Sequence, residues 1–310
     1  MTEWTGKRYW LIGASAGLGE ALAHKLGRLG AEVIVSARSE DKLAALVDEL
    51  PVSASYQTID VQDIDSIRAA VKAVGPVDGV VYLAGAYWPF GAQEWEPEHA
   101  TAMIDVNLTG LVRVMGEVVP DMVKRDAGHI VITSSLTAYR GLPKSIGYTA
   151  SKAGTLSLAE CMHADLRKTG VKVQVINPGF IRTQLTDKND FKMPFLMEPE
   201  AAAQQVVEHM SGSSFKKSFP FGFSLFFRLA QFLPDGIYYR LFGLPDRARD
   251  PPGLIASHGG AVFFKQRTSP RPDRRGIFRQ CRERRQQLRG VVFRAFQRQH
   301  RRQVVDRGDI

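Results

Sequence analysis

The stretch YWLI-GASAGLG-EALAHKL, residues 9–26, decides the fold. An apolar run, a glycine turn and an amphipathic run follow one another, which predicts a strand, a tight turn and a helix. Glycines let the backbone of such a turn approach a pyrophosphate closely, and the N-terminus of the following helix presents free N–H groups to it. The stretch therefore predicts a dinucleotide site formed by Gly13, Ser15, Ala16, Gly17, Leu18 and Gly19.

The end of the next apolar run indicates which dinucleotide binds. Residues 32–37 lead into Arg38 and Ser39, where a dinucleotide fold places the residue that contacts the adenosine ribose. An Asp or Glu at this place would accept hydrogen bonds from a free 2′-hydroxyl. Arg38 instead offers forked donors to a 2′-phosphate, and Ser39 adds a hydroxyl. The expected cofactor is therefore NADP (NADPH) rather than NAD.

Outward from this unit, apolar runs alternate with helical patterns along the chain. The expected strands are residues 9–13, 33–37, 55–59, 79–84, 129–134 and 172–177. Such alternation is typical of an α/β fold with one doubly wound parallel sheet, helices on both faces and ligands at the carboxyl ends of the strands. The predicted architecture is a single Rossmann-type domain over residues 1–245.

A second motif supplies chemistry. Tyr148 and Lys152 are four residues apart, so on a helix they share a face and the ammonium can stabilise the phenolate. A tyrosine whose pKa is lowered in this way can exchange a proton with a carbonyl or alcohol oxygen near neutral pH. Ser135, at the end of the apolar run before this helix, is placed to hold the same oxygen.

Taken together, these motifs resemble the short-chain dehydrogenase/reductase family over residues 5–245. The resemblance implies a catalytic tetrad of Asn107, Ser135, Tyr148 and Lys152. In it Ser135 orients the carbonyl, Lys152 also binds the nicotinamide ribose, and Asn107 holds a water that links Lys152 to solvent. The implied cofactor contacts outside the glycine turn are Asp60, Val61, Ala84, Gly85, Asn107, Tyr148, Lys152, Pro178, Gly179, Ile181 and Thr183.

The chain departs from the family pattern at two places. Ile12 replaces the Thr that opens the glycine motif, and Tyr82-Leu83 replace both asparagines of the Asn-Asn-Ala-Gly motif. The intact tetrad favours an NADP-dependent enzyme that interconverts a carbonyl and a secondary alcohol. The alternative is a catalytically silent NADP-binding sensor or scaffold. Substrate determinants are expected in residues 136–146 and 183–200.

The net charge of +9 belongs to the C-terminal tail. Residues 1–245 have 24 basic and 26 acidic residues, a net charge of −2, whereas residues 246–310 carry +11, with 16 Arg and one Lys. No specific nucleic-acid partner is expected for the body. For the tail, a disordered appendage or a frame-shifted end ranks above a functional basic arm, because Lys nearly disappears there while Arg and Pro abound.

Residues 215–242 hold eight of the 17 phenylalanines. They predict an amphipathic helix that Pro234-Asp-Gly236 stops, with Ser224, Arg228 and Gln231 on its polar stripe. It can pack on the domain, mediate a homo-oligomer, form a lid over an apolar substrate, or lie on a membrane surface with Lys216 and Lys217 facing the headgroups.

The remaining composition points to the cytoplasm. The two cysteines, Cys161 and Cys281, give no disulfide framework, which is typical of a reducing compartment. The seven histidines show no metal-ligand spacing, so no metal site is expected. The predicted location is cytoplasmic, with a membrane-peripheral position as the alternative.

Overall fold

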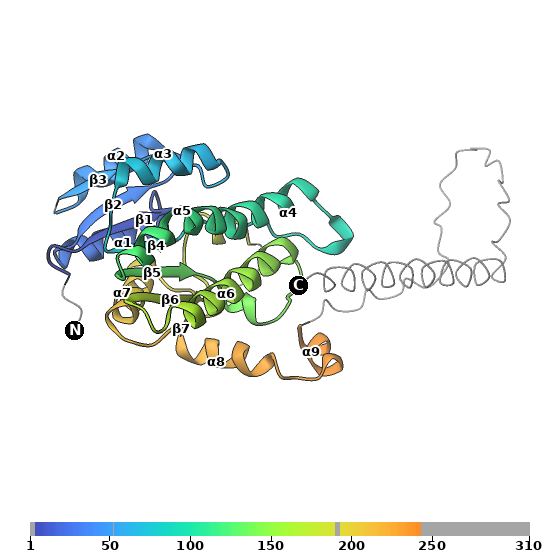
Figure 1. Ribbon diagram of the computed structural model, residues 1–310. Helices are drawn as coiled ribbons and strands as arrows, with labels where there is room; N and C mark the ends of the chain where they lie inside the picture. Colours follow the sequence, from blue (N-terminus) through green and yellow to red (C-terminus); the bar gives the residue numbers. More distant parts are fainter. Residues whose placement is uncertain (1–3, 52, 190–192, 243–310) are drawn as a thin grey trace, which may run out of the picture. The chain divides into compact units, whose positions relative to one another are not determined.

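The computed structural model describes residues 4–51, 53–189 and 193–242. Within them seven strands form one sheet in which every neighbouring pair is parallel (Figure 1). Across the sheet the order is β3-β2-β1-β4-β5-β6-β7. The strands are β1 (Arg8–Ile12), β2 (Glu32–Ser36), β3 (Ala54–Tyr56), β4 (Gly79–Tyr82), β5 (Gly128–Thr133), β6 (Val171–Pro178) and β7 (Lys216–Phe219).

Helices cover both faces of this sheet. On one face lie α1 (Gly17–Arg28), α2 (Glu40–Glu49) and α7 (Pro199–Ser211). On the other lie α3 (Ile64–Val74), α5 (Gly110–Lys124) and α6 (Ile146–Leu166), with α4 (Pro97–Ile104) packed on α6. Two further helices, α8 (Phe221–Ala230) and α9 (Asp235–Phe242), follow β7 at the edge of the domain (Figure 1).

The central strands are buried on both faces, and alternate residues enter two separate cores. In β1, Tyr9 and Leu11 pack among the side chains of α1 and α7, whereas Trp10 and Ile12 pack among those of α3 and α5. Side chains of a strand point alternately to the two faces, so an unbroken apolar run is what a doubly covered parallel strand requires. The runs that predicted strands owe their composition to this double burial.

The strand order reverses at β1, which lies between β2 and β4. Open α/β sheets bind ligands at such a reversal, in the crevice beyond the carboxyl ends of the strands. The glycine turn follows β1, and Leu83-Ala84 follow β4 at the same edge. The fold thus brings the two motifs together at the place where a crevice is expected.

The predicted α/β class and parallel sheet are confirmed, and six of the seven strands overlap the predicted runs. The seventh, β7, was not predicted. Residues 243–310, which include the predicted domain boundary and the Arg-rich tail, lie outside the described residues. The boundary and the nature of the tail stay predictions.

Residues 215–242 do not form the single amphipathic helix that was predicted. Lys216 and Lys217 lie in β7 and form ion pairs with Glu160 and Glu208, at 2.9 and 3.1 Å, so they do not extend from a helix toward headgroups. Of the predicted polar stripe, Arg228 is exposed but Ser224 is not. Ser224 is buried, because its hydroxyl donates to the carbonyl of Phe221 at 2.8 Å and needs no water.

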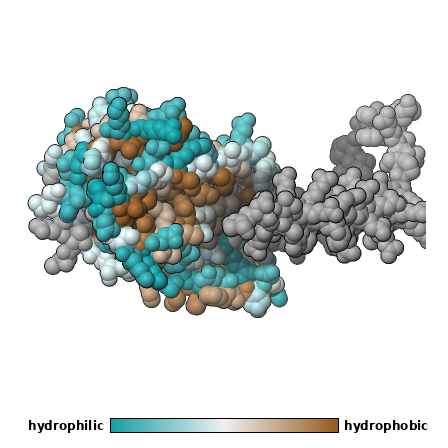
Figure 2. All heavy atoms as spheres, in the orientation of Figure 1, coloured by the Kyte–Doolittle hydropathy of each residue, from teal (hydrophilic) through white to brown (hydrophobic). Residues whose placement is uncertain are grey.

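Aromatic and aliphatic side chains of α8, of α9 and of the segment between them face outward instead, along the edge that appears apolar in Figure 2. They are Phe221, Leu225, Phe226, Leu229, Phe232, Ile237, Tyr239 and Leu241. Contact of this segment with a membrane or with a second copy of the chain stays a prediction. In the part of the chain that the structure describes, no helix has the length and apolar character needed to cross a membrane.

Candidate active site

Gly13 lies where the two halves of the sheet approach most closely. Its φ is +94°, a left-handed conformation that favours glycine. A Cβ added there would lie 2.4 Å from the backbone nitrogen of Ala84 and 2.6 Å from its Cα. The loops that follow β1 and β4 therefore touch through bare backbone, and the turn needs glycine for that reason.

The other two glycines of the turn bring α1 close to two different segments. A Cβ on Gly19 would lie 2.4 Å from the carbonyl oxygen of Gly13, so the first turn of α1 packs directly on the turn before it. A Cβ on Gly17 would lie 2.7 Å from Cγ2 of Thr183, which follows β6. Ala16, the N-cap, forms no side-chain hydrogen bond with the helix, so it leaves the first N–H groups of α1 to a ligand.

These loops surround a cavity of about 470 Å³. It has the size, the bare backbone and the helix N-terminus that a dinucleotide requires, so the residues present fit that group. Of the described residues predicted to contact the cofactor, all but Asn107 line it: Gly13, Ser15, Ala16, Gly17, Leu18, Gly19, Arg38, Ser39, Asp60, Val61, Ala84, Gly85, Tyr148, Lys152, Pro178, Gly179, Ile181 and Thr183.

Sequence reasoning missed several residues of this cavity. Lys42 lines it beside Arg38 and Ser39, in the first turn of α2, so two cations lie at this end. The four-residue spacing of Arg38 and Lys42 across the start of a helix could have signalled the second cation. Trp88 also lines the cavity, but nothing in the sequence joins it to residues so distant along the chain.

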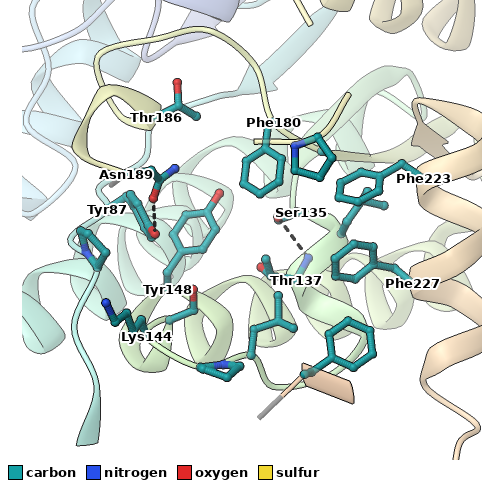
Figure 3. A pocket seen from close by; sticks show the side chains of 18 of the residues that line it. Tyr87, Ser135, Thr137, Lys144, Tyr148, Phe180, Thr186, Asn189, Phe223 and Phe227 are labelled. Atoms are coloured by element: carbon teal, nitrogen blue, oxygen red, sulfur yellow. Dashed lines mark hydrogen bonds between the residues drawn. The ribbon is translucent and has the colours of Figure 1, made fainter. Parts of the chain in front are cut away.

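Ser135 and Tyr148, two of the predicted catalytic residues, lie where the end of β5 meets α6 (Figure 3). Ser135 is buried just after β5, and its hydroxyl forms a hydrogen bond with Tyr148 on α6. The Ser135 Oγ also accepts from the backbone N–H of Thr137 at 3.2 Å. Behind them, Ser134 Oγ donates to the carbonyl of Lys152 at 2.8 Å. These contacts at the end of β5 thus fix the position of α6 relative to the sheet, and with it the position of Tyr148.

Lys152 is the buried cation of the site, with only 4% of its surface exposed. Its Nζ donates to the carbonyl oxygen of Thr133 at 3.0 Å and lies 5.7 Å from the centre of the Tyr148 ring. Burial lowers the pKa of Lys152 to about 8. At pH 7 the side chain therefore still carries its proton, but it would release that proton at a pH only about one unit higher.

The pKa of Tyr148 moves in the opposite direction from the sequence-based expectation. Removal from water raises it to about 12, and the hydrogen bond with Ser135 opposes that rise. Lys152 does not lower it in this structure, because the ammonium points at the Thr133 carbonyl rather than at the phenol. The protein alone holds the tyrosine protonated, which is the form that donates a proton.

Asn107 does not contact the dinucleotide cavity. It is fully buried in a π-helical turn, Asp105–Thr109, between α4 and α5. Its Oδ1 accepts from the backbone N–H of Ala86 at 2.7 Å, and its Nδ2 donates to the carbonyl of Ala86 at 3.0 Å and to Ser151 Oγ at 2.9 Å. The side chain holds the loop after β4 against α6. The expected water link from Asn107 to Lys152 stays a prediction.

The two departures from the family pattern have structural roles. Ile12 is fully buried, and its carbonyl accepts from the backbone N–H of Leu83 at 2.8 Å. Tyr82 is also buried, and its hydroxyl donates to the carbonyl of Val106 at 2.7 Å. The tyrosine therefore ties the end of β4 to the turn that contains Asn107.

A second cavity, of about 610 Å³, opens on the other side of Tyr148 (Figure 3). Ser135 lines it, and Tyr148, Gly179, Leu185 and Thr186 line both cavities. Both predicted substrate segments contribute to its walls, the first through Leu136, Thr137, Leu142, Pro143, Lys144 and Ser145 and the second through Leu185, Thr186, Asn189 and Pro194. The phenylalanines of α8 and α9 that complete it are Phe223, Phe226, Phe227 and Phe242. A compound in this cavity reaches Ser135 and Tyr148 from the side opposite the glycine turn.

Known proteins are similar to this chain in sequence and in fold. The family model for short chain dehydrogenases matches residues 7–193. An uncharacterized oxidoreductase of Myxococcus xanthus is 36% identical over 245 residues, which cover 77% of this chain and 97% of that protein.

Two solved structures extend the likeness to three dimensions. Actinorhodin polyketide ketoreductase with NADPH is 26% identical, with a TM-score of 0.64 over 72% of this chain and 98% of that one. An alcohol dehydrogenase from the archaeon Thermococcus sibiricus, complexed with 5-hydroxy-NADP, is also 26% identical, with a TM-score of 0.62 over 69% of this chain and 95% of that one. The chain therefore belongs to the short-chain dehydrogenase/reductase family of oxidoreductases.

Proposed function

We propose that this protein interconverts a carbonyl and a secondary alcohol with NADP as cofactor, and that Tyr148 is the acid/base. The observation that carries the proposal is the position of Tyr148, which lines both the dinucleotide cavity and the second cavity and is hydrogen-bonded to Ser135. NADP, when bound, supplies or accepts the hydride. The protein then has to hold the oxygen and move one proton.

Ser135 and Tyr148 divide that work. In the direction of reduction the Ser135 hydroxyl donates to the carbonyl oxygen and polarises it, and the Tyr148 hydroxyl gives up its proton as the alcohol forms. A tyrosine whose pKa is about 12 is fully protonated at pH 7, which suits the donor role. The tyrosinate that remains needs a nearby cation, and the buried ammonium of Lys152 is the one that shares its helix face.

The preference for NADP rests on the cationic end of the dinucleotide cavity. Arg38 and Lys42 line it together with the Ser39 hydroxyl. A 2′-phosphate gains charge-assisted hydrogen bonds from such a set, whereas a free 2′-hydroxyl has no acidic partner at residues 38 and 39. We infer that NADPH binds more tightly than NADH.

A catalytically silent NADP-binding protein is the second candidate. It requires the glycine turn and Arg38 but has no use for a serine and a tyrosine hydrogen-bonded beside a second cavity. The cytoplasmic location and a homo-oligomeric state stay predictions.

The test is turnover of a panel of ketones and alcohols with both cofactors, followed by nicotinamide absorbance. We expect turnover with NADPH, and a loss of roughly 100- to 10,000-fold in the Tyr148→Phe variant, because the hydroxyl that exchanges the proton is removed. NADPH binding, measured by fluorescence, should be unchanged in that variant. Tyr56→Phe, at a surface position of β3, is the matched control. Turnover by Tyr148→Phe at the rate of the control would refute the role of Tyr148, and NADPH binding without any turnover would favour the silent protein.

A further inference from the structure

Arg140 joins the catalytic loop to the C-terminal helices. It directly follows the short helical turn Leu136–Tyr139, which begins next to Ser135. Its guanidinium donates to three backbone carbonyls at the end of α8, those of Ala230, Gln231 and Leu233. The last carbonyls of a helix have no partner within the helix, so one planar cation here satisfies the end of α8.

The same side chain also fixes α9. Arg140 pairs with Asp235 at the start of α9, and its guanidinium carbon lies 3.9 Å from the centre of the Tyr238 ring. The Tyr238 hydroxyl donates to the carbonyl of Gly141 at 2.9 Å, and its ring is buried. The loop that carries Ser135 and the α8–α9 pair are therefore joined by a cation, a ring and four backbone carbonyls.

The rings of α8 and α9 form one connected aromatic wall on the second cavity (Figure 3). Ring centres are 5.0 Å apart for Phe223 and Phe227, 5.8 Å for Phe226 and Phe227, and 5.4 Å for Phe226 and Phe242. Phe242 in turn stacks on Tyr238 at 4.5 Å. The wall thus runs without a break from Phe223 to the ring of Tyr238, on which Arg140 lies.

The charge of the cavity is as informative as its apolar wall. Among the described residues that line it, Lys144 is the only one with a formal charge, and it lies at the exposed rim. The polar groups that face the interior are the hydroxyls near Tyr148 and Ser135 and the amide of Asn189, which accepts from the Tyr87 hydroxyl at 2.9 Å. A charged substituent deep in this cavity would lose its water without gaining a partner.

We propose that the substrate is an uncharged ketone, or the matching alcohol, with a bulky aromatic body that lies against the phenylalanines of α8 and α9, and that Arg140 is the positioning residue that holds this wall. The proposal rests on the proposed carbonyl chemistry of Ser135 and Tyr148. A cavity of about 610 Å³ takes a compound of two or more rings. Rings in its wall can meet such a body edge-to-face or offset, as aromatic pairs prefer.

The first experiment compares benzophenone, which has two rings, with 2-butanone, which has none, and with 4-benzoylbenzoate, which adds a carboxylate to the same two rings. Each ring that leaves water for an apolar wall favours binding by roughly 10- to 100-fold. We expect kcat/KM for benzophenone to exceed that for 2-butanone by at least about 100-fold, and the carboxylate to reverse most of that gain. Equal values for the three ketones would overturn the proposal.

The second experiment separates the wall from the catalytic groups. Phe223→Ala removes one ring of the wall, and Phe221→Ala removes an exposed ring from the same helix outside the cavity. We expect Phe223→Ala to raise KM for benzophenone by roughly 10-fold with kcat and the 2-butanone values within about twofold, and Phe221→Ala to change neither. Identical KM values in the two variants would contradict the assigned wall.

The role of Arg140 in holding the wall is tested in the same way, by comparing the effects of a substitution on KM and on kcat. Arg140→Ala should raise KM for benzophenone by about 10-fold while leaving kcat for 2-butanone within about twofold, and Arg140→Lys should restore part of the loss. If Arg140→Ala does not fold, Tyr238→Phe answers the question, because it removes only the hydrogen bond to Gly141 and should raise the same KM by a few-fold. An equal fall of kcat for both ketones would mean that Arg140 acts on the catalytic groups, not on the wall.

Calorimetry distinguishes failure of this inference from failure of the proposed function. Binding of benzophenone, with and without NADP, is measured for the wild type, Phe223→Ala and Phe221→Ala. Weaker binding in Phe223→Ala alone, together with an absence of turnover, would refute the proposed reaction and keep the aromatic site. Benzophenone binding no tighter than 2-butanone binding would refute the aromatic site whether or not the protein reduces ketones.

Discussion

Lowering the pH from about 7.5 to about 4.5 should destabilise this protein through its two buried histidines, His129 and His209, and substitution isolates the contribution of His129. His129, at the start of β5, lies between Tyr9 of β1 and Gln174 of β6, with hydrogen bonds of 2.9 Å to the Tyr9 hydroxyl and 2.8 Å to Gln174 Oε1. Gln174 Nε2 donates to the carbonyl of His209, so its Oε1 is the atom that faces His129. His129 Nε2 therefore carries the proton, and Nδ1 accepts from Tyr9.

The sign and size of the effect follow from the pKa of this histidine. Burial, with a smaller contribution from the positive charge of Lys172, lowers the pKa of His129 from 6.5 to about 4. Below pH 6.5 the unfolded chain binds a proton that the folded chain refuses, so stability is complete above that pH and falls as the pH approaches 4. A pKa shift of one unit corresponds to about 1.4 kcal/mol, so the free energy of unfolding should fall by about 3 kcal/mol.

Urea unfolding at the two pH values measures this loss. In His129→Leu the titrating group is absent, so its stability should fall by about 3 kcal/mol less than that of the wild type between the two pH values, whatever its stability at pH 7.5. His99→Gln, at a half-buried position, is the control and should follow the wild type. Equal pH dependence of wild type and His129→Leu, within about 0.5 kcal/mol, would refute the reasoning. So would an NMR titration in which His129 takes up its proton above pH 6.

Three further predictions concern the cofactor site and the tail. Arg38→Asp should reverse the preference toward NADH, and a wild type that binds NADH as tightly as NADPH would contradict the role given to Arg38. Gly19→Ala places a Cβ 2.4 Å from a backbone oxygen, so it should weaken NADPH binding at least about 10-fold and lower the free energy of urea unfolding by about 1–3 kcal/mol. The control is Gly116→Ala in α5, where nothing lies within 4 Å of the added Cβ, and it should be neutral or stabilising by up to about 1 kcal/mol in the same assay. Truncation after Leu244 should leave NADPH-dependent turnover unchanged and the thermal midpoint within a few degrees, and a larger drop would show that the tail packs on the enzyme.

Sequence patterns predicted the parts of the fold in which local composition and burial agree. The strand β5 is apolar on both faces because both faces are covered, so its composition alone identifies it. The strand β7 has the sequence Lys-Lys-Ser-Phe and carries no such signal. It is an edge strand, and its lysines pair with Glu160 of α6, 56 residues away, and with Glu208 of the preceding helix α7, nine residues away.

The site was predictable to the same extent. Short motifs identified the residues around the dinucleotide cavity, because each one follows a strand and the carboxyl ends of parallel strands meet. Arg140 had no such signal, since its partners are at least 90 residues away. The direction of the Tyr148 pKa also escaped prediction, because it depends on burial and on where the Lys152 ammonium points.

Four residues form a common partition between the two cavities: Tyr148, Gly179, Leu185 and Thr186. A ligand on one side of a partition fixes the same atoms that a ligand on the other side would otherwise have to fix. Where the first ligand bears the entropic cost of fixing these atoms, the second ligand binds with higher affinity. The factor by which the affinity rises is the same whichever ligand binds first. Affinities measured for either ligand alone would then understate its affinity in the ternary complex.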